Sequence, residues 1–284
     1  MRDGLPSGTS FLVSFARGLG VDEQELDPLA RELLPPWLAR LADAPSALGG
    51  AASLYRNAVR ATTFGFIDHM VLRTKAIDVH LAGALRSGID QLVILGAGLD
   101  ARAWRLAALK NATVFEVDHP ATQQYKRGRI GDRTPPADVR YVAVDFEKER
   151  FSDGLMNAGF RSDEPSVWIW EGVAMYLSLE AIHDTLAQLA PLAAAGSELA
   201  MTYRVPGMLP FGTLGRMVIP ALFNVGGEPL KSTLEPHELT SAIAPEWDVV
   251  YDEDARGWQK LTGSAADPAR SFLAERLAIA KRRA

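Results

Sequence analysis

The sequence predicts an α/β protein with an open, mostly parallel sheet that is preceded by helices. Two observations lead to this fold class. Residues 8–88 carry apolar side chains at helical spacing, whereas short apolar runs alternate with helical stretches from residue 91 onward. Strands that alternate with helices form parallel sheets covered by helices on both faces. Several of the runs end in Gly, Asp or Glu, which predicts a ligand site at the carboxyl ends of the strands.

The domain organisation follows from the same change of pattern. Residues 1–88 are expected to form a helical N-terminal extension or lid, whose last helix runs from Phe66 to Leu85 and stops at Gly88. Residues 89–284 are expected to form one Rossmann-like domain. Its predicted strands are 91–95, 113–117, 139–144, 166–170, 198–203 and 247–251.

Composition narrows the possible functions. Asp and Glu outnumber Lys and Arg, 35 to 30, which gives a net charge of −5, and no basic block suggests a nucleic-acid partner. The absence of cysteine excludes disulfides, zinc–thiolate sites and cysteine nucleophiles. No secretory signal or apolar membrane span is evident, so we expect a cytoplasmic protein without a membrane partner. The five histidines lack metal-ligand spacing, and no metal is expected.

A glycine-rich turn provides the strongest local signal. Leu95-Gly96-Ala97-Gly98-Leu99-Asp100-Ala101 follows a predicted strand and opens a helical stretch from Ala101 to Leu109. Glycines allow a tight turn and a close approach of the backbone to a ligand, and a helix N-terminus favours an anionic group. Gly96, Gly98 and Ala101 also fit the dinucleotide fingerprint, with Asp118 near the ribose-binding position. A nicotinamide-dependent oxidoreductase therefore remains an alternative at this point.

Acidic residues after the later strands favour an adenosyl cofactor other than a nicotinamide dinucleotide. Asp145 and Phe146 follow the third strand, where a carboxylate can accept from an exocyclic amine and a ring can cover the adenine. Glu171 ends the fourth strand, where it could pair with an amino-acid ammonium or complement a helix dipole. No separate dehydrogenase catalytic domain is evident.

The order of these motifs resembles the leucine carboxyl methyltransferase-like family, including its bacterial O-methyltransferases of secondary metabolism, such as polyketide pathways. The resemblance spans residues 73 to about 230. The matching segments are Arg73-Thr-Lys-Ala-Ile-Asp78, Val93-Ile-Leu-Gly-Ala-Gly-Leu-Asp-Ala-Arg-Ala-Trp-Arg-Leu106, Phe115-Glu-Val-Asp-His-Pro120, Val144-Asp-Phe146, Trp170-Glu-Gly-Val-Ala-Met-Tyr-Leu177 and, more weakly, Gly227-Glu-Pro229. The family usually has Thr-Arg where this chain has Ala101-Arg102, and often Leu at the position of Phe146.

The resemblance implies a class I methyltransferase fold that binds S-adenosyl-L-methionine and releases S-adenosyl-L-homocysteine. It implies that Arg73 holds the carboxylate of the methionine moiety, that Asp118 binds the ribose, and that Glu171 lies near the methionine end. Asp145 and Phe146 would bind the adenine, and Gly96 would lie against the cofactor backbone. The full expected cofactor site is Arg73, Gly96, Ala97, Gly98, Asp118, His119, Asp145, Phe146, Glu171 and Gly172.

The acceptor is expected to be a small molecule. Residues 205–236 are rich in proline, glycine and apolar side chains, which suits a cap over an apolar or aromatic substrate. A carboxylate acceptor is ionised at neutral pH and needs no general base, which agrees with the lack of an evident catalytic dyad. Tyr176, Tyr203 and Arg204 are candidates to orient it. The alternatives are a phenol or hydroxyl acceptor, a protein carboxyl terminus, an NAD-dependent oxidoreductase and a cofactor-binding scaffold without methyl transfer.

Overall fold

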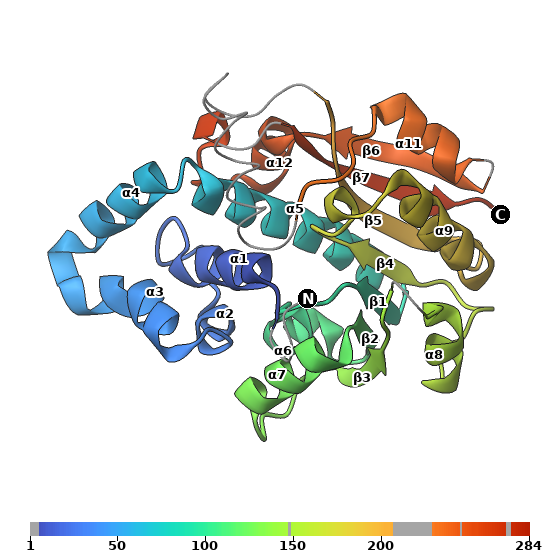
Figure 1. Cartoon of the computed structure of the whole chain (residues 1–284), viewed down its shortest axis with the longest axis horizontal. Helices are drawn as coiled ribbons and strands as arrows, with labels where there is room; N and C mark the ends of the chain where they lie inside the picture. The colour runs from blue at the N-terminus through green and yellow to red at the C-terminus, as the bar shows by residue number, and fades with distance from the viewer. Residues whose placement is uncertain (1–5, 147–148, 207–228, 245, 271–273) are drawn as a thin grey trace.

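The computed structural model describes residues 6–146, 149–206, 229–244, 246–270 and 274–284, and it contains one seven-stranded sheet (Figure 1). The strand order is β3-β2-β1-β4-β5-β7-β6. The first five strands along the chain pair in parallel, whereas β7 pairs antiparallel with both β5 and β6. The strands are β1 (Gln91–Leu95), β2 (Thr113–Asp118), β3 (Asp138–Ala143), β4 (Val167–Trp170), β5 (Glu198–Arg204), β6 (Trp247–Glu253) and β7 (Glu275–Arg282).

All six predicted strands are present, and the predicted mostly parallel α/β fold is confirmed. The seventh strand, β7, was not predicted. The expected helical stretch from Ala101 to Leu109 is shorter in the structure, because it divides into α6 (Arg102–Arg105) and a 3-10 turn at Ala107–Leu109.

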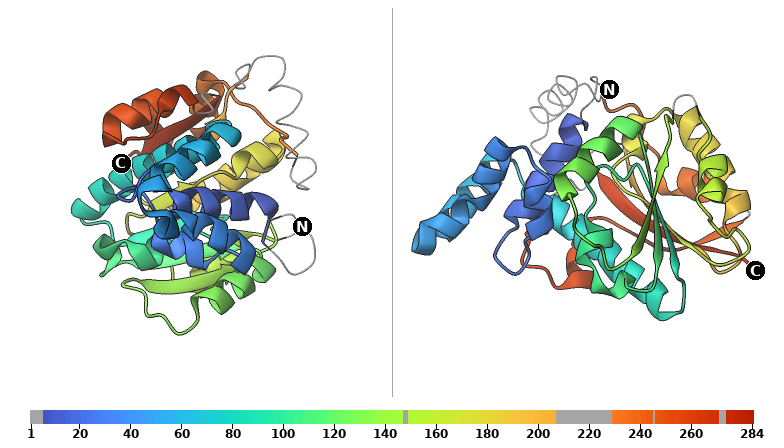
Figure 2. Two further views of the ribbon diagram at one scale, coloured as in Figure 1. Left: turned by 90° about the vertical axis from the view of Figure 1, so that its left-hand side faces the viewer. Right: turned by 90° about the horizontal axis from the view of Figure 1, so that it is seen from below.

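Helices cover both faces of the sheet (Figure 2). Alternate residues of a strand point to opposite faces, so Leu92 and Ile94 of β1 join one core cluster while Val93 and Leu95 join the other. The first cluster includes residues of α5 (Phe66–Arg86) and α12 (Ala255–Thr262), and the second includes residues of α8 (Phe151–Asn157), α9 (Leu179–Leu189) and α11 (Pro236–Ile243). Helix α7 (Pro120–Ile130) follows β2.

Between residues 8 and 86 the chain forms helices joined by short loops, as the apolar spacing predicts. Helix α5 packs on the sheet, while α3 and α4 extend away from it (Figure 1). Helix α1 lies beside α5, and the segment after it is tied to the sheet domain by an ion pair of 3.0 Å between Asp27 Oδ2 and Arg105 Nε. The helices before α5 are α1 (Gly8–Leu19), α2 (Pro28–Glu32), α3 (Pro36–Leu48) and α4 (Ala52–Thr62).

The expected cap at 205–236 falls largely on residues 207–228, which lie outside the described residues. Within the described part of the chain, none of the helices combines the length and the hydropathy that crossing a bilayer requires.

Candidate functional site

A cavity of about 630 Å³ lies at the carboxyl ends of the parallel strands. Its floor is formed by the residues that follow β1, β2, β3 and β4, and one side is formed by the N-terminal part of α1. Strand order reverses between β1 and β4, and such a switch point is where open α/β sheets bind ligands.

The glycine turn after β1 brings the backbone against this cavity. Gly96 has a φ of +66°, and a Cβ at this position would lie 2.5 Å from Cγ2 of Val173. Gly98 has a φ of +51°, and its Cβ would lie 3.1 Å from the hydroxyl oxygen of Ser10. Positive φ and close packing both require glycine here. The turn therefore packs closely against Val173 and Ser10, and a larger residue at Gly96 or Gly98 would displace them.

Asp118 stands at the end of β2 and faces the glycine turn. Its carboxylate accepts hydrogen bonds from the backbone N–H of Gly98 and, at 2.6 Å, from that of His119. Burial raises the pKa of Asp118, and the two backbone donors oppose that rise. His119 caps α7, since its Nδ1 accepts from the N–H of Ala121 at 3.2 Å.

Asp145 and Phe146 form the next part of the wall, directly after β3. The N–H of Asp145 donates to Oε2 of Glu149 at 3.0 Å, and its carbonyl accepts from the N–H of Glu149 at 2.8 Å. This turn holds both residues at the cavity, where they meet the glycine turn and Asp118.

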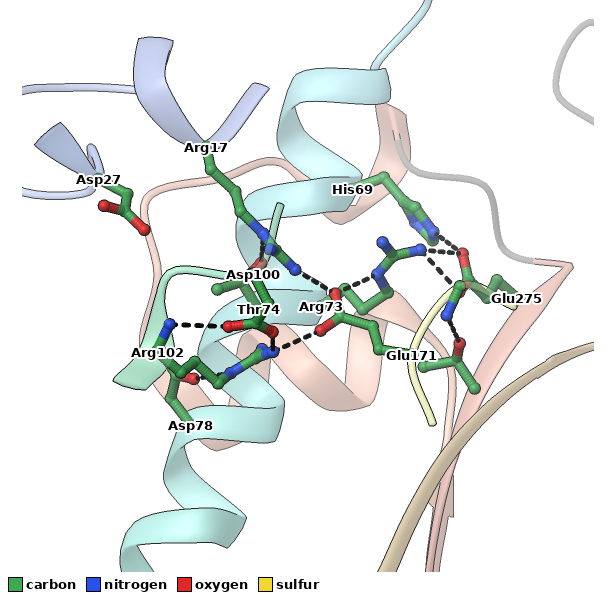
Figure 3. Close-up of polar contacts among 12 residues, drawn as sticks. Arg17, Asp27, His69, Arg73, Thr74, Asp78, Asp100, Arg102, Glu171 and Glu275 are labelled. Atoms are coloured by element: carbon green, nitrogen blue, oxygen red, sulfur yellow. Dashed lines mark hydrogen bonds and ion pairs between the residues drawn. The ribbon is translucent and has the colours of Figure 1, made fainter. Parts of the chain in front are cut away.

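Glu171, at the end of β4, is surrounded by three guanidinium groups (Figure 3). Its Oε1 accepts from Nη2 of Arg17 at 2.5 Å and from Nε of Arg73 at 2.9 Å, and its Oε2 accepts from Nη1 of Arg102 at 2.7 Å. Burial alone would raise the pKa of Glu171, but the three guanidinium charges hold it well below its usual value. The carboxylate is therefore ionised at neutral pH.

Arg73 lies between two carboxylates. Besides its bond to Glu171, its Nη1 donates to both carboxylate oxygens of Glu275, at 2.9 and 3.2 Å. The side chain is only 5% exposed and still lines the cavity. A Cβ at Gly172 would lie 3.2 Å from Nη2 of Arg73, so the guanidinium also packs on the turn after β4.

The structure brings the expected cofactor residues together. All ten of them line the cavity, and so does Tyr176. Tyr203 and Arg204 are not among the lining residues that the structure describes. The Tyr203 hydroxyl donates to Oδ2 of Asp252 at 2.6 Å, and burial raises its pKa. Arg204 is half-buried close to Tyr176, its Nε has no hydrogen-bond partner among the described residues, and burial lowers its pKa.

Three charged residues of the site were not predicted. Arg17 comes from a region without a recognised motif, and Glu275 comes from the strand that was not predicted. Arg102 stood inside the glycine-turn motif, yet no role was assigned to it, although its pairing with Asp100 and Asp78 fixes that turn. The sequence signal that could have identified it is Asp100, which stands two residues before Arg102 within the motif.

The geometry agrees with the comparison to known families. The model of the leucine carboxyl methyltransferase family matches residues 21–190, which is more than half of the chain. The chain belongs to the leucine carboxyl methyltransferase family. The family resemblance of the sequence motifs is thereby confirmed.

Proteins similar to this chain are named as methyltransferases. A candidate S-adenosyl-L-methionine-dependent methyltransferase of Mycobacterium tuberculosis H37Rv is 32% identical over 269 residues, covering 93% of this chain and 79% of the relative. One from Mycobacterium sp. JLS is 35% identical over 211 residues, covering 68% of this chain and 65% of the relative. This protein is thus an S-adenosyl-L-methionine-dependent methyltransferase.

Solved structures share the fold of this family member. A DUF574 family protein of Streptomyces avermitilis superposes with a TM-score of 0.62 at 15% identity, with 97% of each chain covered. A protein of Thermobifida fusca described as a methyltransferase gives a TM-score of 0.60 at 16% identity, with 100% of this chain and 97% of the other covered.

Proposed function

We propose that this methyltransferase transfers the methyl group to the carboxylate oxygen of a small apolar or aromatic acid and forms a methyl ester. The observation that carries the proposal is Arg204, a half-buried guanidinium that lies behind the cavity-lining Tyr176 and has no carboxylate partner among the described residues. Lys231 is a cation that does line the cavity, together with Tyr176 and Leu177. Neither cation has a carboxylate partner among the residues that the structure describes, and such a pair of cations favours an anionic acceptor.

The cavity suits the cofactor that the family uses. We propose that Asp118 binds the ribose hydroxyls, that Asp145 and Phe146 bind the adenine, and that Gly96 allows the backbone to approach the cofactor. Arg73 would hold the carboxylate of the methionine moiety, with Glu171 near its ammonium. All of these residues line one cavity of about 630 Å³, and Nη2 of Arg73 has no hydrogen-bond partner among the described residues, which supports this fit.

When bound, S-adenosyl-L-methionine supplies an electrophilic methyl group on a sulfonium sulfur. The residues of the chain would then act by alignment, holding the acceptor oxygen roughly 3–3.5 Å from the methyl carbon. Arg204 and Tyr176 would orient the acceptor carboxylate. No residue has to remove a proton, because a carboxylic acid with an ordinary pKa near 4 is already ionised at neutral pH. A phenol, with an ordinary pKa near 10, would need a base.

The test uses paired acceptors on one aromatic scaffold, with either the carboxyl or the phenol group masked. Each is incubated with the protein and S-adenosyl-L-methionine, and the added methyl is located by mass spectrometry. We expect a methyl ester on the scaffold with the free carboxyl group. Methylation of the phenol alone would overturn the carboxylate proposal and leave the methyltransferase assignment in place.

A further inference from the structure

Glu275 is a buried carboxylate that joins the site from a distant part of the chain. It begins β7, well beyond the residues 21–190 that match the family model, and its side chain is 7% exposed. Its carboxylate accepts a hydrogen bond from Nη1 of Arg73 and lies 2.5 Å from Nε2 of His69. His69 and Arg73 are four residues apart on α5 and therefore share one helix face, and both point to Glu275 in Figure 3.

Glu275 is also connected to the turn after β4. The N–H of Gly172 donates to the hydroxyl oxygen of Thr202 at 2.8 Å, and the Thr202 hydroxyl in turn forms a hydrogen bond with the carboxylate of Glu275. One carboxylate thus fixes Arg73 on α5 and, through Thr202, the backbone that follows Glu171. Although burial opposes it, the positive charge of Arg73 and the hydrogen bond with His69 lower the pKa of Glu275 to about 2, so this carboxylate remains an anion.

The orientation of the Arg73 guanidinium depends on this arrangement. Its Nε is bound to Glu171 and its Nη1 to Glu275, whereas Nη2 makes no hydrogen bond to any described residue. A planar guanidinium held at two of its nitrogens has a fixed plane, and the remaining edge has a fixed direction. The side chain lines the cavity, so that edge is available to a ligand carboxylate.

We propose that Glu275 is a positioning residue for cofactor binding, which acts by fixing the Arg73 guanidinium in the orientation that receives the methionine carboxylate. This inference rests on the proposed role of Arg73. It assigns a function to a residue outside the matched family segment, and it explains why an ionised carboxylate is buried on the far side of the arginine from the cavity. Glu275 itself does not line the cavity, so in this proposal it would touch neither the cofactor nor the acceptor.

The experiment is a double-mutant cycle with Glu275→Gln and Arg73→Lys, read out as the dissociation constant of S-adenosyl-L-homocysteine by calorimetry. Each single variant should weaken binding about tenfold, since residues of one polar network couple by 0.5–3 kcal/mol, which is about 2- to 150-fold. If Glu275 acts through Arg73, adding Glu275→Gln to Arg73→Lys should weaken binding by less than about twofold.

Glu198→Gln is the matched control, because Glu198 also pairs with a cation across the β5–β7 ladder but lies at its other end. Its Oε1 is 2.8 Å from Nζ of Lys281, and it does not line the cavity. It should lower the thermal midpoint without changing the dissociation constant by more than about twofold. Should Glu275→Gln fail to fold, Glu275→Asp takes its place in the cycle, because it keeps the buried charge and withdraws it by one methylene.

The outcomes separate the two proposals. If Arg73→Lys binds as tightly as the wild type, the role of Arg73 as anchor fails, and this inference fails with it. If Arg73→Lys weakens binding while the folded Glu275 variant binds normally, only the positioning role is overturned. The same conclusion follows if the Glu275 substitution weakens binding by an equal factor with Arg73 and with Lys at position 73.

Discussion

Glu171 and its three guanidinium partners form a group of buried charges in which each member is costly to remove. Deleting one member of a buried ion pair costs about 3–5 kcal/mol, because the partner is left without compensation. Arg73→Ala would leave both Glu171 and Glu275 without this guanidinium, so it would lower stability as well as cofactor affinity. Substitution by lysine keeps a cation between the two carboxylates and removes only the planar geometry.

Arg204 and Tyr203 are neighbours that we expect to differ in function. Arg204→Ala should lower kcat/KM for an acid acceptor by roughly 10- to 150-fold, because a hydrogen bond to a charged group contributes about 1.5–3 kcal/mol. Binding of S-adenosyl-L-homocysteine should not change. The measurement compares acceptor kinetics with cofactor calorimetry. Equal loss in both would place Arg204 in the cofactor site or the structural core.

Tyr203→Phe is the control for this prediction. The Tyr203 hydroxyl donates to Asp252, which also accepts from Nε of Arg276 at 2.8 Å. Removing the hydroxyl should cost about 1–3 kcal/mol of stability, while acceptor kinetics stay close to those of the wild type. A selective loss of acid turnover in this variant would restore Tyr203 as an acceptor residue.

Single residues could be predicted from the sequence where a motif places them beside a strand end. Gly96 and Glu171 directly follow a strand and Asp118 ends one, and the sheet brings such positions to one edge. Arg17 and Glu275 could not be predicted, because their place at the site depends on how α1 and β7 pack and not on a local pattern. Tyr203 was proposed for the acceptor side, but strand alternation turns its hydroxyl toward Asp252.

At the scale of elements, α1 forms part of the wall of the cavity at the strand ends. Ser7, Ser10, Val13, Ser14 and Arg17 line it, at the spacing of one helix face. Arg17 also fixes the helix to the body, since its Nε donates to the hydroxyl oxygen of Thr74 at 2.8 Å and its Nη2 to Glu171. A ligand in the cavity would therefore be in contact with this helix as well as with the sheet.

We expect S-adenosyl-L-homocysteine to slow amide hydrogen exchange in residues 8–19. A ligand that binds only when α1 is packed against the rest of the cavity stabilises that packing against local unfolding. The measurement is hydrogen exchange followed by mass spectrometry, with and without the ligand. Residues 236–243 of α11 do not line the cavity and serve as the internal control. Protection of the glycine turn without protection of 8–19 would show that α1 is not part of the binding site.

Strand β7 was not predicted, because its local sequence does not favour a strand. The segment Glu-Arg-Leu-Ala-Ile-Ala-Lys-Arg of β7 contains mostly residues that favour helices. Its place between β5 and β6 gives it partners on both edges, and Ala278 and Ala280 pack in the core. Strand formation there depends on tertiary pairing, which overrides the weak local preference. The other strands are rich in Val, Ile and Trp or alternate with helices, so they were predictable.

At the scale of the whole molecule, the buried acids make stability depend on pH. The pKa of Glu275 is lowered to about 2, and that of Glu171 lies well below its usual value. In the unfolded chain such groups titrate near 4.5. Their contribution is therefore complete above about pH 4.5, and it decreases as the pH falls toward 2, because the unfolded chain binds protons that the folded protein excludes.

We expect the thermal midpoint of the wild type to fall steeply between pH 4.5 and 3, and that of Glu275→Gln to fall less steeply. The lost contribution of Glu275 amounts to about 3 kcal/mol at the acid end. Thermal unfolding at several pH values measures both slopes, with Glu198→Gln as a control that should keep the wild-type slope. Equal slopes in the wild type and Glu275→Gln would show that the Glu275 carboxylate does not cause the pH dependence of stability.

The position of Glu275 in the last strand has a consequence for how the protein is made. During synthesis the glycine turn and the first five strands leave the ribosome before β7, which must still insert between β5 and β6. Until it does, Arg73 lacks one of the two carboxylates that orient it. If Arg73 holds the cofactor as proposed, a nascent chain would bind S-adenosyl-L-methionine less tightly than the folded protein, and the cofactor would stabilise folded molecules in preference to partial ones.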